Sequence, residues 1–238
     1  MIPGFMHAGV LVGLLVLGAP AFAHDDSPPL EEVTRDLGHI DFPNSGARAA
    51  QPAFLRGVLL LHSFEFDAAR KAFQDAETAD PGFALAYWGE ALSYNMPIWG
   101  EQDLDEARAA LAKLAPTAEQ RRARAPDPRE RDYLASAEQL YGEGDKVQRD
   151  ARYSVALGEM ARKYPNDLDA RAFYALSLMA LTGTTRNTAN YMRAAAEAEA
   201  VYALDNRHPG ALHYLIHAYD DPVHAPLGLR AARQYGQV

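Results

Sequence analysis

Apolar residues recur at helical spacing from Ala53 to the end of the chain. Alanine, leucine and aromatic residues return every three or four positions, which places them on one face of an α-helix. Residues 24–52 lack this period over any long window, and prolines and glycines interrupt them. The pattern therefore predicts an all-α protein, in which a mostly irregular leader at 24–52 precedes a helical domain at 53–238.

One piece of the leader, residues 38–46, combines apolar and turn-forming residues. Ile40 and Phe42 offer apolar anchors, and Asn44-Ser45-Gly46 is typical of a turn. We expect this piece to lie as a strap across the helical domain.

Clusters of proline, glycine and arginine divide the helical region into pairs of helices. Interruptions are expected at 96–100 and 182–188, and an Arg- and Pro-rich linker is expected at 116–128. The next helix should run over 129–141, and an alanine-rich helix after 188 should stop near Asn206. The sequence thus predicts about four or five irregular helix pairs, stacked as an α-solenoid in which each pair buries its apolar face against its neighbours.

The first helix pair carries small and large residues at the spacing of a tetratricopeptide repeat. Gly57 and Ala69 are small where paired helices must cross closely. Phe73 fills the groove between the two helices, and Pro81 ends the second one, because proline cannot continue a helix. These residues resemble the tetratricopeptide repeat family, and the match weakens further along the chain. The resemblance implies a concave groove that receives a peptide or protein partner.

Three longer blocks resemble a set of bacterial, often secreted, tetratricopeptide-type proteins. The blocks read L-L-H-S-F-x-x-x-A, W-G-E-A and H-P-G-A-x-H-Y-x-I-H-A-x-D, and here they are Leu60–Ala68, Trp88–Ala91 and His208–Asp220. The resemblance carries a fold and a motif but no reaction. Members of the set continue with further helices and another histidine-rich segment, so we expect the domain at 53–238 to be truncated at its C-terminus.

A groove that binds a partner would draw on polar and aromatic side chains of the inner helices. The residues predicted to line it are His62, Glu90, Trp99 and Tyr214. The alternative is that these side chains pack in the core or lie on the surface. Their separation along the sequence does not show whether they share one groove.

The segment from His208 to Ala225 has the most unusual composition, with four of the eight histidines of the chain and two adjacent aspartates. Pro209 suits the first turn of a helix that runs through Tyr219. His213 and His217 stand four residues apart, so their imidazoles project from one helical face about one turn apart.

This spacing suits two ligands on one metal ion. Histidine with carboxylate is a ligand set for Zn²⁺ or Cu²⁺, and the predicted metal ligands are His213, His217, Asp220 and His224. The segment lacks the glutamate of the H-E-x-x-H motif, so a zinc peptidase of that type is not indicated. The alternative is that the histidines are polar spacers in helix packing, bonded to nearby aspartates or carbonyl groups. A second alternative is a Cu²⁺ site at His24, which becomes the N-terminus if residues 1–23 are cleaved. The acidic residues that follow His24 are equally consistent with a solvated tail.

Charge and composition narrow the function and the compartment. A net charge of -9 and a pI near 5.3 argue against nucleic-acid binding, which requires basic surface. The chain has no cysteine, so it forms no disulfide and offers no thiolate to a metal.

The first 23 residues predict a cleaved signal peptide, because an apolar run at 8–18 precedes Ala21-Phe22-Ala23. An uncleaved anchor is the alternative. Cleavage places the protein in the periplasm or outside the cell, with no membrane span in the mature chain.

Two functions follow from these patterns. The first is a non-catalytic scaffold, secreted or periplasmic, that binds a peptide or protein in a concave groove. The second is a metal-binding protein that holds Zn²⁺ or Cu²⁺ in the histidine segment. This second function includes that of a metal-dependent enzyme.

Overall fold

The computed structural model describes residue 1, residues 37–181 and residues 185–238. Residues 2–23 of the predicted signal peptide and residues 24–36 of the leader lie outside this part. The described chain is all-α, as predicted, with eleven α-helices and very little strand. The first elements are α2 (Gln51–His62), α3 (Phe66–Ala79), α4 (Ala84–Leu92), β1 (Asn95–Met96), η1 (Pro97–Trp99), β2 (Glu101–Gln102), α5 (Leu104–Leu114) and α6 (Ala118–Arg124).

The second half of the chain is entirely helical. Its elements are α7 (Pro128–Leu140), α8 (Lys146–Lys163), α9 (Leu168–Ala180), α10 (Thr188–Leu204), α11 (Pro209–Tyr219) and α12 (Ala225–Tyr235). Most helices begin at an aspartate, asparagine or threonine whose side chain accepts a hydrogen bond from the first turn, which explains where these helices start.

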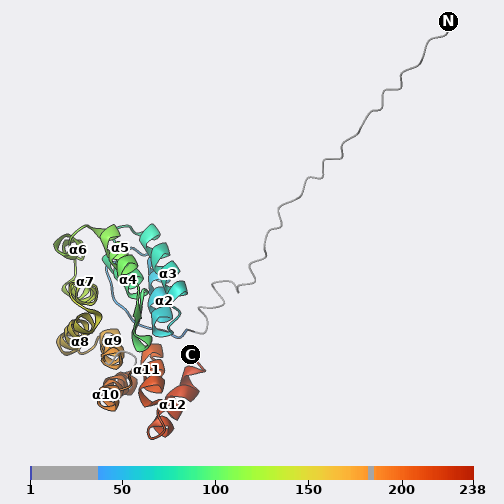
Figure 1. The fold of residues 1–238 in the computed structure, drawn as a ribbon, viewed down its shortest axis with the longest axis vertical. Helices are drawn as coiled ribbons and strands as arrows, with labels where there is room; N and C mark the ends of the chain where they lie inside the picture. The colour runs from blue at the N-terminus through green and yellow to red at the C-terminus, as the bar shows by residue number, and fades with distance from the viewer. Residues whose placement is uncertain (2–36, 182–184) are drawn as a thin grey trace.

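Helices that follow one another in sequence pack against each other, which is a solenoid-like arrangement. The stack also curls back on its beginning. In Figure 1 the chain runs from α2 over the top to α8, then along the bottom to α11, which lies below α2. Helix α11 packs against both α9 and α2, so residues about 150 positions apart meet where the curl closes.

The strap lies inside this curl. Residues 37–50 contain no helix or strand, and Ile40 and Phe42 are buried, as expected for apolar anchors. The Phe42 ring contacts the rings of Phe54, Trp88 and Tyr133, which come from α2, α4 and α7. Burial of such a ring contributes about 2–3 kcal/mol. The inner face of the first helices is therefore covered by the protein's own strap.

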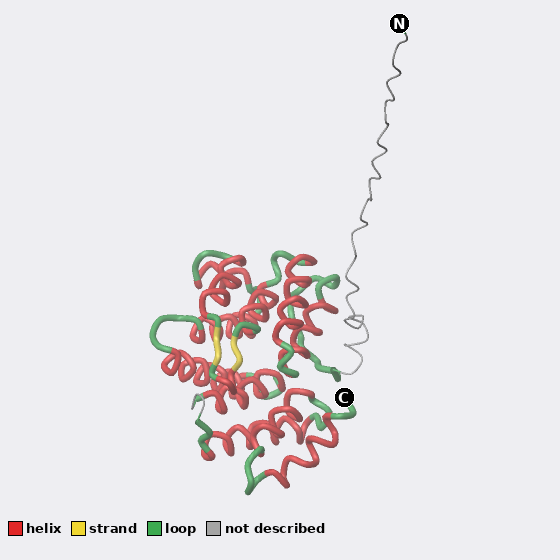
Figure 2. Tube along the Cα trace, turned by 45° about the vertical axis from the view of Figure 1, so that its right-hand side comes forward, coloured by secondary structure: helices red, strands yellow, loops and turns green. Residues whose placement is uncertain are grey.

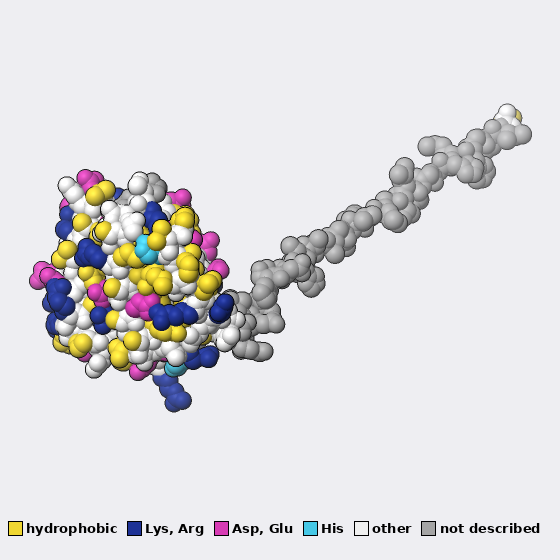
Figure 3. Space-filling view, turned by 90° about the horizontal axis from the view of Figure 1, so that it is seen from below, with side chains coloured by type: hydrophobic (Ala, Val, Ile, Leu, Met, Phe, Trp, Pro, Cys, Tyr) yellow, Lys and Arg dark blue, Asp and Glu magenta, His cyan; other side chains and the backbone are white. Residues whose placement is uncertain are grey.

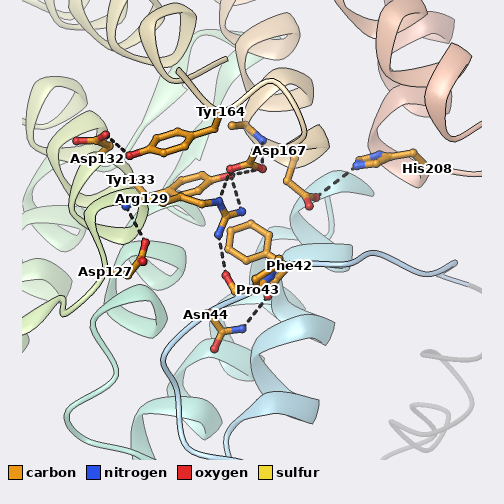
Figure 4. A network of polar contacts seen from close by, with 12 residues as sticks. Phe42, Pro43, Asn44, Asp127, Arg129, Asp132, Tyr133, Tyr164, Asp167 and His208 are labelled. Atoms are coloured by element: carbon orange, nitrogen blue, oxygen red, sulfur yellow. Dashed lines mark hydrogen bonds and ion pairs between the residues drawn. The ribbon is translucent and has the colours of Figure 1, made fainter. Parts of the chain in front are cut away.

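Arg129 fastens the strap from outside. Its guanidinium donates to the carbonyl oxygen of Pro43 at 2.7 Å, pairs with Asp167 and lies over the Phe42 ring (Figure 4). A half-buried arginine that has both a carboxylate and a carbonyl partner recovers the cost of its desolvation.

Phe73 fills a close crossing between α3 and its two neighbours, α2 and α4. A Cβ atom added at Gly57 would lie 2.7 Å from the Phe73 ring, and one at Gly89 would lie 2.2 Å from it. Both helices that flank Phe73 thus need glycine at the crossing, because an added methyl group would overlap the ring.

Two local elements differ from or refine the predictions. The predicted interruption at 96–100 forms a small antiparallel pair, β1 with β2, around η1 (Figure 2). The predicted linker at 116–128 is wrong in part, because it contains α6. Thr117 and Gln120 form a capping box there, and Arg121 pairs with Glu138 of α7, which together stabilise a short arginine-rich helix.

Candidate functional site

The closing contact between α2, α9 and α11 is a buried polar cluster. We call it the closure cluster, and it consists of His62, Asp169, His208 and Tyr214. Asp169 Oδ1 lies 2.9 Å from His62 Nε2 and 3.4 Å from His208 Nε2, and the Tyr214 hydroxyl lies 2.8 Å from His62 Nδ1. The exposed fractions of these residues are 0% to 2%. Figure 4 shows His208 directed at the carboxylate.

The H-P-G sequence at the start of α11 makes this contact possible. His208 is the N-cap, and its Nδ1 accepts a hydrogen bond from the backbone N–H of Ala211 at 3.3 Å. A Cβ atom added at Gly210 would lie 2.3 Å from His62 Nδ1. Glycine is therefore required for the first turn of α11 to sit against the imidazole of α2.

Hydrogen-bond partners determine the protonation of the closure cluster. The Ala211 N–H is a donor, so Nδ1 of His208 accepts. The Asp169 carboxylate only accepts, so neutral His62 carries its proton on Nε2, and the Tyr214 hydroxyl donates to His62 Nδ1. Burial lowers the pKa of His62, although Asp169 opposes this. Burial would raise the pKa of Asp169, but contacts from His208 and His62 outweigh it and hold that pKa well below its usual range. The cluster thus holds an ionised carboxylate beside the neutral imidazole of His62.

The closure cluster also has the composition of a metal site. Its potential ligand atoms on His62, Asp169 and His208 all lie within 4.8 Å of one another. A histidine that binds metal through Nε2 must carry its proton on Nδ1, and Nδ1 of His208 faces a backbone N–H donor instead. We conclude that this cluster joins helices and that its hydrogen bonds disfavour a metal.

A second histidine cluster lies next to it on the accessible side of α11. His213 and His217, which we call the histidine pair, have their Nε2 atoms 3.1 Å apart. His213 Nδ1 donates to the backbone carbonyl of His62 at 2.6 Å. Because a carbonyl oxygen only accepts, the lone pair of neutral His213 lies on Nε2, toward His217. Metal-binding histidines characteristically donate their other ring N–H in this way.

Burial keeps the histidine pair neutral. It lowers the pKa of His213 to about 4, with a further contribution from His217, and it also lowers the pKa of His217. A metal bound to both Nε2 atoms at about 2.0–2.1 Å would subtend an N–metal–N angle of about 98°. That angle lies between square-planar and tetrahedral values, which suit Cu²⁺ and Zn²⁺ respectively.

Aromatic rings enclose the histidine pair. The ring centroid of Phe64 lies 4.3 Å from that of His213 and 5.4 Å from that of His217, and the Tyr235 ring stacks on His213 at 5.0 Å. Phe64 has a φ of 62°, in the left-handed region. It follows Ser63 after α2, and the N–H groups of Phe64 and Glu65 bond back to Leu61 and Leu60. This is a Schellman motif with phenylalanine at the position that glycine normally holds.

We expect Phe64→Gly to be more stable than Phe64→Ala by about 1 kcal/mol in the free energy of unfolding. Both variants lose the ring, but only glycine adopts the left-handed conformation without steric cost. Urea denaturation of the two variants measures the difference. An equal or greater stability of the alanine variant would show that the backbone of Phe64 is not strained.

The other two predicted metal ligands lie apart from the histidine pair. His224 Nδ1 contacts the carboxylate of Asp221 at 2.8 Å, and Asp221 in turn pairs with Arg186 at 3.0 Å. Asp220 is exposed at the C-cap of α11. The structure therefore brings together two of the four predicted ligands, His213 and His217.

The predicted groove residues occupy three different environments. His62 and Tyr214 belong to the closure cluster, and Glu90 is buried beside Lys113. Only Trp99 among the four presents a large exposed surface, at 48%. The sequence contained no signal for Asp169, which stands in an ordinary helix start, whereas His208 was marked by its place in the H-P-G block.

In comparisons with protein-family models, curated proteins and solved structures, nothing matches this chain. The tetratricopeptide resemblance stays a prediction, as does the location in the periplasm or outside the cell. Within the described residues, no helix combines the length and apolar character needed to cross a membrane.

Proposed function

We propose that this protein binds a divalent transition-metal ion, Zn²⁺ or Cu²⁺, through the Nε2 atoms of His213 and His217. The observation that carries the proposal is the hydrogen bond from His213 Nδ1 to the His62 carbonyl. It selects the tautomer that a metal requires and aims the free nitrogen at a second imidazole.

Two further features support the proposal. Burial holds both rings neutral, so no proton has to leave before a metal binds at neutral pH. The histidine pair also lies at an end of the molecule that solvent reaches. Both rings are half-buried and not sealed from solvent, and Figure 3 views the protein from the end where α10, α11 and α12 lie.

Calorimetric titration of the untagged protein with Zn²⁺ and Cu²⁺ tests the proposal. We expect one ion per chain, with binding lost or at least 100-fold weaker in His217→Ala. His217 is the better target, because His213→Ala also leaves the carbonyl of His62 without its donor. A metal excess should raise the thermal midpoint of the unmodified protein, since the ion binds the folded state.

His224→Ala is the matched control for this titration. His224 is a half-buried histidine on the same segment, but its ring faces Asp221 and not the histidine pair. Its removal should leave the stoichiometry and the affinity unchanged. Equal losses in the His217 and His224 variants, or less than one ion per chain at saturation, would refute binding at the pair.

A peptide or protein partner remains the second proposal. The strap covers the inner face of the first helices. Trp99, beside Phe64 and Phe66, is the predicted groove residue that stays exposed to a partner.

A further inference from the structure

We propose that a metal ion at the histidine pair keeps coordination positions open to an external ligand, and that this ligand is a small monocarboxylate bound in the adjoining pocket. This inference rests on the proposed metal binding at His213 and His217. It adds the class of molecule that the site would receive.

The protein supplies too few ligands to complete a coordination sphere. Within the described residues, the histidine pair has no third histidine, aspartate or glutamate whose ligand atom lies within 4.8 Å of both nitrogens. Zn²⁺ and Cu²⁺ take about four ligands, so about two positions would hold water or another small molecule. Sites closed by four protein ligands are structural, whereas open positions allow exchange.

A pocket of about 500 Å³ adjoins His213, and its volume suits a small molecule. His213 forms part of its wall, between the end of α2 and the end of α12. The polar lining consists of Ser63, Glu65, His213 and Tyr235. The apolar lining consists of Leu37, Leu60, Ala68 and Val238.

Charge and lining select the ligand class. Two neutral imidazoles leave the charge of a divalent ion uncompensated, so an anionic oxygen ligand is favoured. Tyr235 lines the same pocket as His213, so its hydroxyl is the donor available to a second carboxylate oxygen. Glu65 is exposed on the rim and would repel a second negative charge. A single carboxylate with a short apolar chain fits these constraints.

Electron paramagnetic resonance of the Cu²⁺-loaded full chain tests the inference, with acetate and butyrate as probes and perchlorate as the salt control. We expect both carboxylates to change the Cu²⁺ spectrum saturably, and perchlorate to leave it unchanged. Butyrate should bind about three- to tenfold more tightly than acetate, because two further methylene groups become partly buried.

Tyr235→Phe separates the ligand site from the metal site. It keeps the stacked ring but removes the hydroxyl, so carboxylate binding should weaken about three- to tenfold while the Cu²⁺ affinity stays within about twofold. Tyr202→Phe is the control, because the Tyr202 hydroxyl bonds to Gln234 on α12 and does not line the pocket. The Tyr202 variant should bind both probes normally.

Two outcomes would overturn the inference while the metal proposal stands. One is stoichiometric Cu²⁺ binding with a spectrum that neither carboxylate alters. The other is a large loss of Cu²⁺ affinity in Asp220→Asn, which would show that this exposed aspartate swings in to fill an open position. Absence of any Cu²⁺ binding would instead refute the proposed function itself.

Discussion

Asp169→Ala should lower the free energy of unfolding by about 3–5 kcal/mol, the largest effect that we expect from a single substitution in this protein. Asp169 is the common partner of two buried imidazoles, from α2 and from α11. Its removal leaves the Nε2–H group of His62 without an acceptor and removes the carboxylate that lies 3.4 Å from His208 Nε2, in a site that water does not reach. Chemical denaturation monitored by circular dichroism measures the loss.

Asp169→Asn distinguishes the charge from the hydrogen bonds. The amide oxygen still accepts from His62 at the position of Oδ1, so the loss should fall to about 1–3 kcal/mol. Asp75→Ala is the surface control, because Asp75 forms only an exposed ion pair with Lys71 on the same helix, and it should cost less than about 0.5 kcal/mol. A loss at Asp169 as small as that at Asp75 would mean that the closure cluster does not hold α2, α9 and α11 together.

The stability that the Asp169 carboxylate contributes should decrease at low pH. The pKa of Asp169 is lowered in the folded protein, so its contribution to stability is present above the unfolded pKa of about 4 and is lost as the pH falls below it. The difference in unfolding free energy between the unmodified protein and Asp169→Asn should therefore narrow below about pH 4.

Helical periodicity was sufficient to predict the all-α class and most of the helices. The period, together with residues such as Gly57 and Phe73, reflects contacts within one helix pair, and these are local in sequence. The helix inside 116–128 was missed because arginine and proline dominate that stretch, although Thr117 and Gln120 carried a capping signal that could have revealed it.

Only the part of the candidate site that lies on a single helix could be predicted from the sequence. His213 and His217 are one turn apart on α11, so helical geometry alone brings their rings together. The groove role predicted for His62 rested on an open superhelix. The curl of the stack instead brings α11 onto α2 and buries His62 against Asp169, and that curl depends on many small packing angles that no short motif encodes.

Glu77→Gln should stabilise the protein at alkaline pH and leave it unchanged in mild acid. Glu77 of α3 lies in a cluster with Glu90 of α4 and Lys113 of α5. Lys113 Nζ contacts the Glu90 carboxylate at 2.5 Å and 2.7 Å but lies 3.8 Å from Glu77. The lysine thus pairs with Glu90, and Oε1 of Glu77 is buried without a hydrogen-bond partner.

Burial, followed by hydrogen bonding to Glu90 and its negative charge, raises the pKa of Glu77 to about 8. Burial would also raise the pKa of Glu90, but hydrogen bonds from Gln74 and Lys113 outweigh it and lower that pKa. Glu77 therefore carries the shared proton at neutral pH. Because the folded protein holds this proton more tightly than the unfolded chain, the free energy of unfolding should fall as the pH rises from about 4.5 to about 8, and then level off.

Glutamine mimics the protonated acid and does not ionise, so Glu77→Gln removes this decline. We expect the variant to match the unmodified protein at pH 5 and to exceed its unfolding free energy by about 1–3 kcal/mol at pH 9. Urea denaturation at pH 5, 7 and 9 measures the difference, with the exposed Glu159→Gln as the control that shows no such change. Equal differences at pH 5 and pH 9 would mean that Glu77 is ionised in the folded protein and that Lys113 neutralises both carboxylates.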